Sequence, residues 1–100
     1  MNAQEKYQLY FTQLVVMFHA ATMQQLGKVK NPLTDKIDRD LAAAQSSIEM
    51  LDMLKEKTRG NLSTDEDRFL SQVLQELKLN YVDEANKPAP TPSGGEGKNP

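Results

Sequence analysis

The segment Lys57-Thr58-Arg59-Gly60-Asn61-Leu62-Ser63-Thr64-Asp65-Glu66 predicts a turn between two helices. Gly60 stands where a helix commonly ends in the left-handed conformation, which glycine adopts without steric cost. Ser63 followed three residues later by Glu66 is the pattern of a capping box, in which two side chains satisfy free backbone N–H groups at a helix start. One helix therefore ends near Thr58, the next begins after Ser63, and the two form a hairpin.

The helix after the turn is predicted to be amphipathic and to run to about Tyr81–Asp83. At 100° per residue its apolar face consists of Phe69, Leu70, Val73, Leu74, Leu77 and Tyr81. The helix before the turn is predicted to begin near Asp38, since acidic residues suit a first turn and the lysines at 55 and 57 suit a last turn. Its apolar stripe consists of Leu41, Ala44, Ile48 and Leu51.

A further helix is expected over Ala3–Leu26, with Gly27 as its left-handed C-cap. It carries two apolar faces. The first consists of Tyr7, Phe11, Leu14, Phe18 and Ala21, and the second of Leu9, Val16, Ala20 and Met23. If the first face packs on the hairpin, the second faces water in a monomer, and the two roles can be exchanged. We therefore predict a homodimer with the second face as the candidate interface, or a contact with another protein.

The chain divides by composition into a helical domain over residues 1–84 and a tail over 85–100. Seven of the ten proline and glycine residues lie in the tail, which has no large apolar side chain. Such a segment cannot bury enough surface to fold, so disorder is expected. The predicted fold class is an all-α, three-helix domain with a disordered C-terminal tail.

Composition excludes several functions. The chain has no cysteine, which rules out disulfides and thiolate metal sites and suits a cytoplasmic location. Its net charge of −2, without a basic face, argues against nucleic-acid binding. The apolar run near Leu14–Ala21 is too short to cross a membrane, and the residues around it are not typical of a signal peptide.

The segments around the turn resemble a small bacterial family known only as a domain of unknown function. The hallmark of that family is a helix of Ile-Asp-x-Leu-x-x-Leu type that runs into Lys-Thr-x-Gly-Asn-Leu. Residues Lys57–Leu62 match the second part as a block, and the resemblance covers roughly residues 11–83. Glu49 replaces the usual aspartate, and Gln45 replaces a frequent basic residue. The resemblance implies a helical fold and a bacterial, cytoplasmic setting, but no activity.

Candidate chemical sites are few. Basic side chains beside a helix start can bind an anion, although caps and turns explain the same residues. The candidate residues of this turn are Lys57, Arg59, Gly60, Asn61 and Ser63. The acids near Asp38 lack the spacing of a calcium loop. His19 is the only histidine, and its helix offers no carboxylate at helical spacing to orient it.

We therefore expect no catalytic residues, no metal and no cofactor. The predicted function is a structural or protein–protein interaction module. The alternative is a regulatory module that binds a small apolar or anionic ligand between its helices, and an enzyme is the weakest hypothesis.

Overall fold

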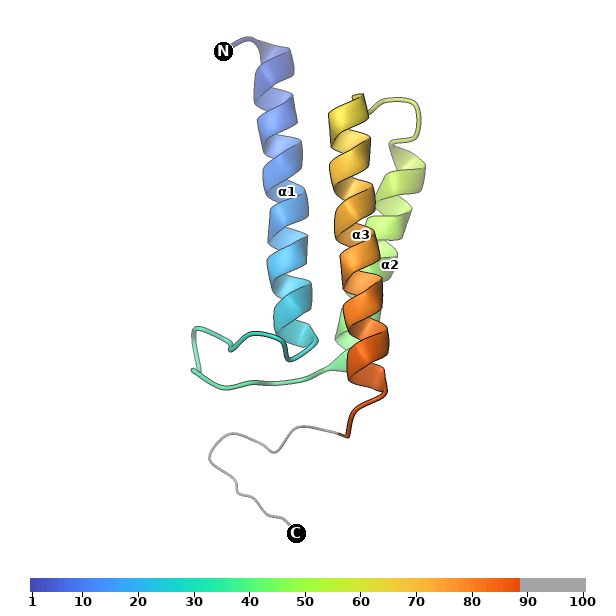
Figure 1. Ribbon diagram of the computed structural model, residues 1–100. Helices are drawn as coiled ribbons and strands as arrows, with labels where there is room; N and C mark the ends of the chain where they lie inside the picture. The colour runs from blue at the N-terminus through green and yellow to red at the C-terminus, as the bar shows by residue number, and fades with distance from the viewer. Residues whose placement is uncertain (89–100) are drawn as a thin grey trace.

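The structure, a computed structural model, describes residues 1–88 and contains three α-helices in that range. Helix α1 spans Ala3–Gln25, α2 spans Leu41–Lys57 and α3 spans Thr64–Ala85. Helices α2 and α3 form an antiparallel hairpin, and α1 lies along it, parallel to α3 (Figure 1). The predicted all-α, three-helix class is confirmed. The prediction of disorder over 85–100 falls mostly on residues 89–100, outside the described range.

The helix ends near the glycines follow the predicted chemistry. Leu26 caps α1, Gly27 adopts φ +80°, and the Lys28 N–H donates to the carbonyl of Met23 at 2.9 Å, as in a Schellman motif. At the hairpin turn Gly60 has φ +84°. The capping box at the start of α3 is present in both directions, with Ser63 as N-cap.

Two helix ends differ from the prediction. Helix α2 begins at Leu41 rather than near Asp38, because the Asp40 carboxylate caps it by accepting from the Ala43 N–H at 3.0 Å. Helix α3 continues to Ala85, beyond the predicted end at Tyr81–Asp83. The reason is tertiary, since Glu84 is buried and its side chain and carbonyl bind residues of the α1–α2 connector.

Those contacts form a charged cluster at the end of the bundle. Lys28 lies 2.6 Å from the Asp83 carboxylate and 2.8 Å from that of Glu84. Arg39 donates to the Glu84 carbonyl oxygen at 2.8 Å, at the end of α3 where carbonyls lack helical partners. Lys87 also pairs with both acids. The cluster attaches the connector to the last turn of α3.

The core lies where the three helices meet. Its buried apolar residues are Val15, Leu26, Ala44, Ile48, Leu51, Leu70, Val73, Leu74 and Leu77. The predicted apolar stripes of α2 and α3 supply seven of these nine side chains. Their burial is the main favourable term for a domain of this size.

The side of α1 that packs on the hairpin differs from both apolar faces predicted from the sequence. The line that faces the hairpin runs through Phe11, Val15, Phe18, Thr22 and Leu26. Tyr7, Leu14 and Ala21, expected beside the two phenylalanines, are exposed. Within α1 the fully buried side chains, Val15 and Thr22, are both compact and β-branched. Thr22 tolerates full burial because its hydroxyl donates to the Phe18 carbonyl at 2.6 Å.

Candidate interaction surface

An exposed apolar strip follows α1 along its whole length. We name this set of residues the α1 strip; it consists of Ala3, Tyr7, Tyr10, Leu14, Met17 and Ala21. Its four large side chains are well exposed: Tyr7 by 65%, Tyr10 by 56%, Leu14 by 40% and Met17 by 67%. Single exposed apolar residues are normal on a protein surface, but a contiguous row of this length usually marks an interaction site.

Five of the six strip residues, all except Ala3, lie in a segment without formal charge. Between Lys6 and Lys28 the sequence has no Asp, Glu, Lys or Arg, so 21 consecutive residues carry His19 as their only titratable side chain other than the two tyrosines. The exposed sides of α2 and α3 carry many charged residues, as a solvated helix usually does. Since charged residues are depleted at the centres of protein interfaces, α1 has the composition of an interface helix.

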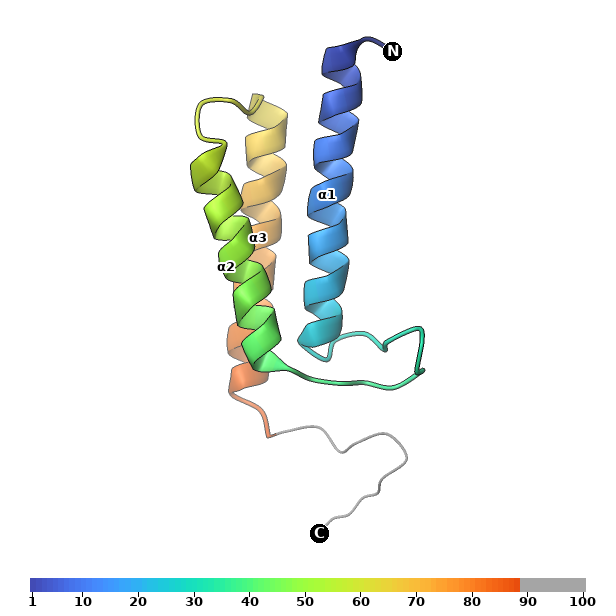
Figure 2. The same ribbon diagram turned by 180° about the vertical axis from the view of Figure 1, so that it is seen from behind.

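The strip lies on the side of α1 that adjoins α2. Gln25 shares a helix face with Ala21, four residues earlier, and its side-chain oxygen accepts from the Ser47 hydroxyl of α2 at 2.7 Å. One turn beyond Ser47, Met50 is half-exposed, as is Met53. Figure 2 shows α1 and α2 side by side, running in opposite directions. The α1 strip and the two methionines of α2 therefore belong to one side of the molecule.

The interface candidates from the sequence lie on the other flank of α1. Leu9, Val16 and Ala20 are exposed, whereas Met23 is half-buried and packs against the core. This flank thus offers two large exposed side chains, fewer than the α1 strip. The sequence grouped Tyr7, Leu14 and Ala21 with Phe11 and Phe18 in one face, so only the observed packing identifies the strip.

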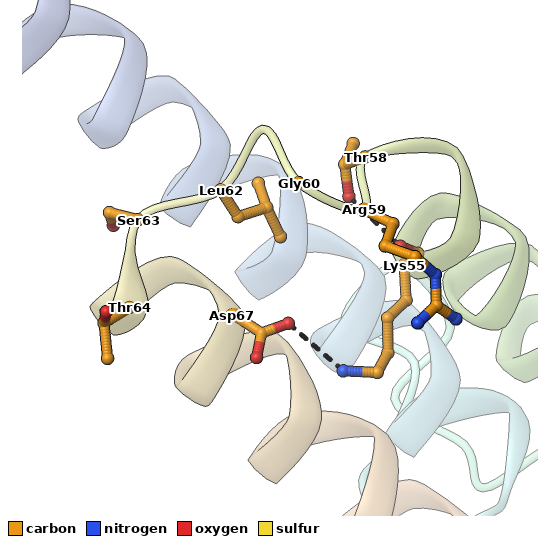
Figure 3. Close-up of a pocket in the computed structure, with 8 residues that line it drawn as sticks. All are labelled: Lys55, Thr58, Arg59, Gly60, Leu62, Ser63, Thr64 and Asp67. Carbon is orange, nitrogen blue, oxygen red and sulfur yellow. Dashed lines mark hydrogen bonds and ion pairs between the residues drawn. The ribbon is translucent and has the colours of Figure 1, made fainter.

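A shallow pocket of about 390 Å³ lies at the turn between α2 and α3 (Figure 3). Of the anion-binding candidates, Arg59, Gly60 and Ser63 line it together with Lys55. Arg59 forms an ion pair with Glu56, which lowers the pKa of the Glu56 carboxyl. Lys55 lies 3.2 Å from Asp67.

The α3 end of this pocket is unsuited to an anion. Three acidic residues, Asp65, Glu66 and Asp67, occupy the first turn of α3, and the Ser63 hydroxyl accepts from the Glu66 N–H. Because Lys55 and Arg59, the two cations that line the pocket, are paired with acidic side chains and the helix start is already acidic, the geometry favours a structural role for this turn.

His19 is oriented by a residue that the sequence does not indicate. Its Nε2 lies 3.1 Å from Oε2 of Glu76 on α3, and both side chains are partly solvent-exposed. The pair connects α1 to the hairpin at the surface, and Glu76 also lines a shallow depression on α3. Within residues 1–88, no group of three or more His, Asp or Glu side chains is placed to hold a metal ion. None of the described helices has the length and apolar character required to span a bilayer.

The fold and this surface define a small three-helix domain whose N-terminal helix presents an uncharged apolar side to solvent. Residues 8–83 match the family described as a domain of unknown function (DUF1844), and the chain belongs to that family. The match agrees with the resemblance seen in the sequence over residues 11–83. No curated protein and no solved structure shows significant similarity to the chain.

Proposed function

We propose that this chain is a protein–protein interaction module that forms a homodimer through the α1 strip. The observation that carries the proposal is the row of exposed apolar side chains on a helix whose last 19 residues, 7–25, contain no Asp, Glu, Lys or Arg. A second copy supplies a surface of the same uncharged character, and a two-fold interface uses the same patch from both chains. Self-association therefore buries the strip without desolvating any Lys, Arg, Asp or Glu within it.

The available area suits a dimer of ordinary size. The four large strip residues with Met50 and Met53 are 40–67% exposed. At about 200 Å² for each fully exposed large side chain, they present roughly 650 Å² per chain. A standard interface buries about 800 Å² per partner. The strip alanines and the glutamines beside them supply the remainder.

The test is light scattering coupled to size-exclusion chromatography at high micromolar concentration. The unmodified chain is expected at about twice its mass of 11.2 kDa. Met17→Glu should give a monomer with unchanged helical circular dichroism, because a buried unpaired carboxylate opposes association while the exposed side chain contributes little to the fold.

Leu79→Glu is the matched control, because this side chain of α3 is as exposed as the strip residues. It should leave the dimer intact. Val16→Glu probes the other flank of α1 and should also leave it intact. A monomeric unmodified chain would refute self-association, and loss of the dimer in Val16→Glu alone would transfer the interface to that flank.

A further inference from the structure

We propose that the two copies pair antiparallel along the α1 strip, with the two-fold axis crossing α1 midway between Tyr10 and Leu14. This inference rests on the proposed homodimer and specifies its geometry. It follows from the spacing of the strip residues, from their sizes and from the position of α2 beside them.

The strip has the spacing of a coiled-coil seam. Its residues follow one another at intervals of four, three, four, three and four positions, which is the alternation that keeps apolar side chains facing a partner helix. All six are exposed, so a second helix can approach along the entire seam. The first ten residues of the chain are exposed on every side, and the hairpin therefore does not obstruct this approach.

In the antiparallel arrangement every layer of the seam is apolar. Tyr10 of one chain faces Leu14 of the second copy, and Tyr7 faces Met17 of the second copy. Ala3 then faces Ala21 of the second copy, and the two-fold axis repeats the three layers. Each of the four central layers combines one tyrosine with one aliphatic or thioether side chain. Sulfur–aromatic contacts between methionine and tyrosine are favourable.

A parallel arrangement distributes the same side chains unevenly. It would place two successive tyrosine–tyrosine layers in the first half of the seam and the smaller leucine–leucine and methionine–methionine layers in the second half, with an alanine layer at each end as in the antiparallel arrangement. Because packed interfaces approach the density of protein interiors, large and small layers in succession leave voids. The antiparallel arrangement also opposes the two helix dipoles, whereas the parallel one aligns them.

Helix α2 compensates for the small residue at the end of each seam. It runs antiparallel to α1 (Figure 2), and Ser47 contacts Gln25. Met50 is therefore level with the turn of α1 that carries Ala21, one turn before Gln25. The half-exposed Met50 side chain is placed to fill the space beside the alanine layer.

Disulfide trapping distinguishes the two arrangements, and the chain is suited to it because it contains no cysteine. The variants are Tyr7→Cys and Met17→Cys, each first shown by light scattering to remain dimeric. Under mild oxidation, an equimolar mixture should form a mixed disulfide between position 7 of one chain and position 17 of the other, identified by mass spectrometry of the linked peptides. Each variant alone should remain uncrosslinked, because antiparallel pairing separates the two equivalent positions by about ten residues of helix, or about 15 Å. A disulfide requires Cα atoms within about 7 Å of each other.

The outcomes separate this inference from the proposed function. Crosslinking of each variant with itself would establish a parallel dimer and overturn the antiparallel arrangement while keeping self-association. A dimer that gives no disulfide in any combination would place the interface elsewhere and would also overturn it. A monomeric unmodified chain would overturn both the antiparallel arrangement and the proposed homodimer. Leu79→Cys on α3 serves as the control for random collisional crosslinking and should give only background.

Discussion

At the scale of single residues, the two glycines inside the described range occupy the same backbone conformation in different surroundings. Gly27 has φ +80° and Gly60 has φ +84°. A Cβ atom added at Gly27 would lie 3.1 Å from the Cβ of Arg39, whereas one added at Gly60 would meet no atom within 4 Å. The first position therefore carries both a backbone and a steric constraint, and the second carries only the backbone constraint.

Gly60→Ala should lower the free energy of unfolding by about 1 kcal/mol, the cost of a left-handed conformation for an L-residue. Gly27→Ala should lower it further, because Arg39 must also move and its contact with the end of α3 is disturbed. Urea unfolding followed by circular dichroism measures both. Gly60→Asn should recover part of the loss, since asparagine tolerates this conformation better. If the free energy of unfolding fell equally in the two alanine variants, the contact with Arg39 would add no steric cost at Gly27.

At the scale of secondary-structure elements, α1 and α3 begin with the same device but in different settings. Asn2 and Glu5 form a capping box for α1, and Ser63 and Glu66 form one for α3. The first turns of α1 are exposed on all sides and extend past the hairpin turn (Figure 1). The start of α3 follows directly from Leu62, which packs against the core. The same motif is thus coupled to the core in one helix and remote from it in the other.

Ser63→Ala should therefore lower the global free energy of unfolding by about 1 kcal/mol, the usual value of an N-cap. In the monomeric Met17→Glu background, where no second copy covers the start of α1, Asn2→Ala should leave the global value nearly unchanged and fray only the first turn of α1. Urea unfolding reports the global value, and amide hydrogen exchange near Glu5 reports the fraying. If Asn2→Ala proved as costly as Ser63→Ala in this monomeric background, the first turn of α1 would have to be packed against another part of the same chain.

At the scale of the whole molecule, the charged cluster joins the connector to α3 and makes stability depend on pH. The hydrogen bond from Lys28 lowers the pKa of Glu84 below its ordinary value of 4.5, and Lys28 and Lys87 together lower the pKa of Asp83 below 3.8. A carboxyl whose pKa is lower in the folded than in the unfolded state contributes stability above the unfolded-state value. That contribution is lost as the pH falls through the folded-state value.

Stability should thus be maintained from neutral pH to about pH 5 and should fall below it, as these carboxylates take up protons. Glu84→Gln should be less stable at neutral pH and should lose less stability between about pH 5 and pH 3 than the unmodified chain. Thermal unfolding across this range is the measurement. Glu49→Gln is the control for removing one negative charge, because that carboxylate accepts a hydrogen bond from Gln45 within the same helix. If Glu84→Gln lost as much stability between about pH 5 and pH 3 as the unmodified chain, the pH dependence could not be assigned to this cluster.

Local patterns were sufficient to predict the three helices, the glycine stops and the capping box of α3. These features depend on residues within one or two turns of each other, such as Ser63 with Glu66 or Gly27 with the carbonyls of the preceding turn. The apolar stripes of α2 and α3 were predicted for the same reason, since each helix has one dominant face. The family match over residues 8–83 also agrees with the resemblance seen in the sequence.

The tertiary structure decided which side of α1 faces the hairpin. This helix carries apolar side chains on several sides, so periodicity cannot select among them, and the buried Thr22 counts as polar in any hydropathy pattern. In the folded structure Val15 and Thr22 are buried, whereas Tyr7, Leu14 and Ala21 are exposed to solvent. Tertiary contacts also determine three further features: the partner of His19, the residue at which α3 ends, and the position of the α1 strip. They depend on contacts between residues distant in sequence, which no local pattern encodes.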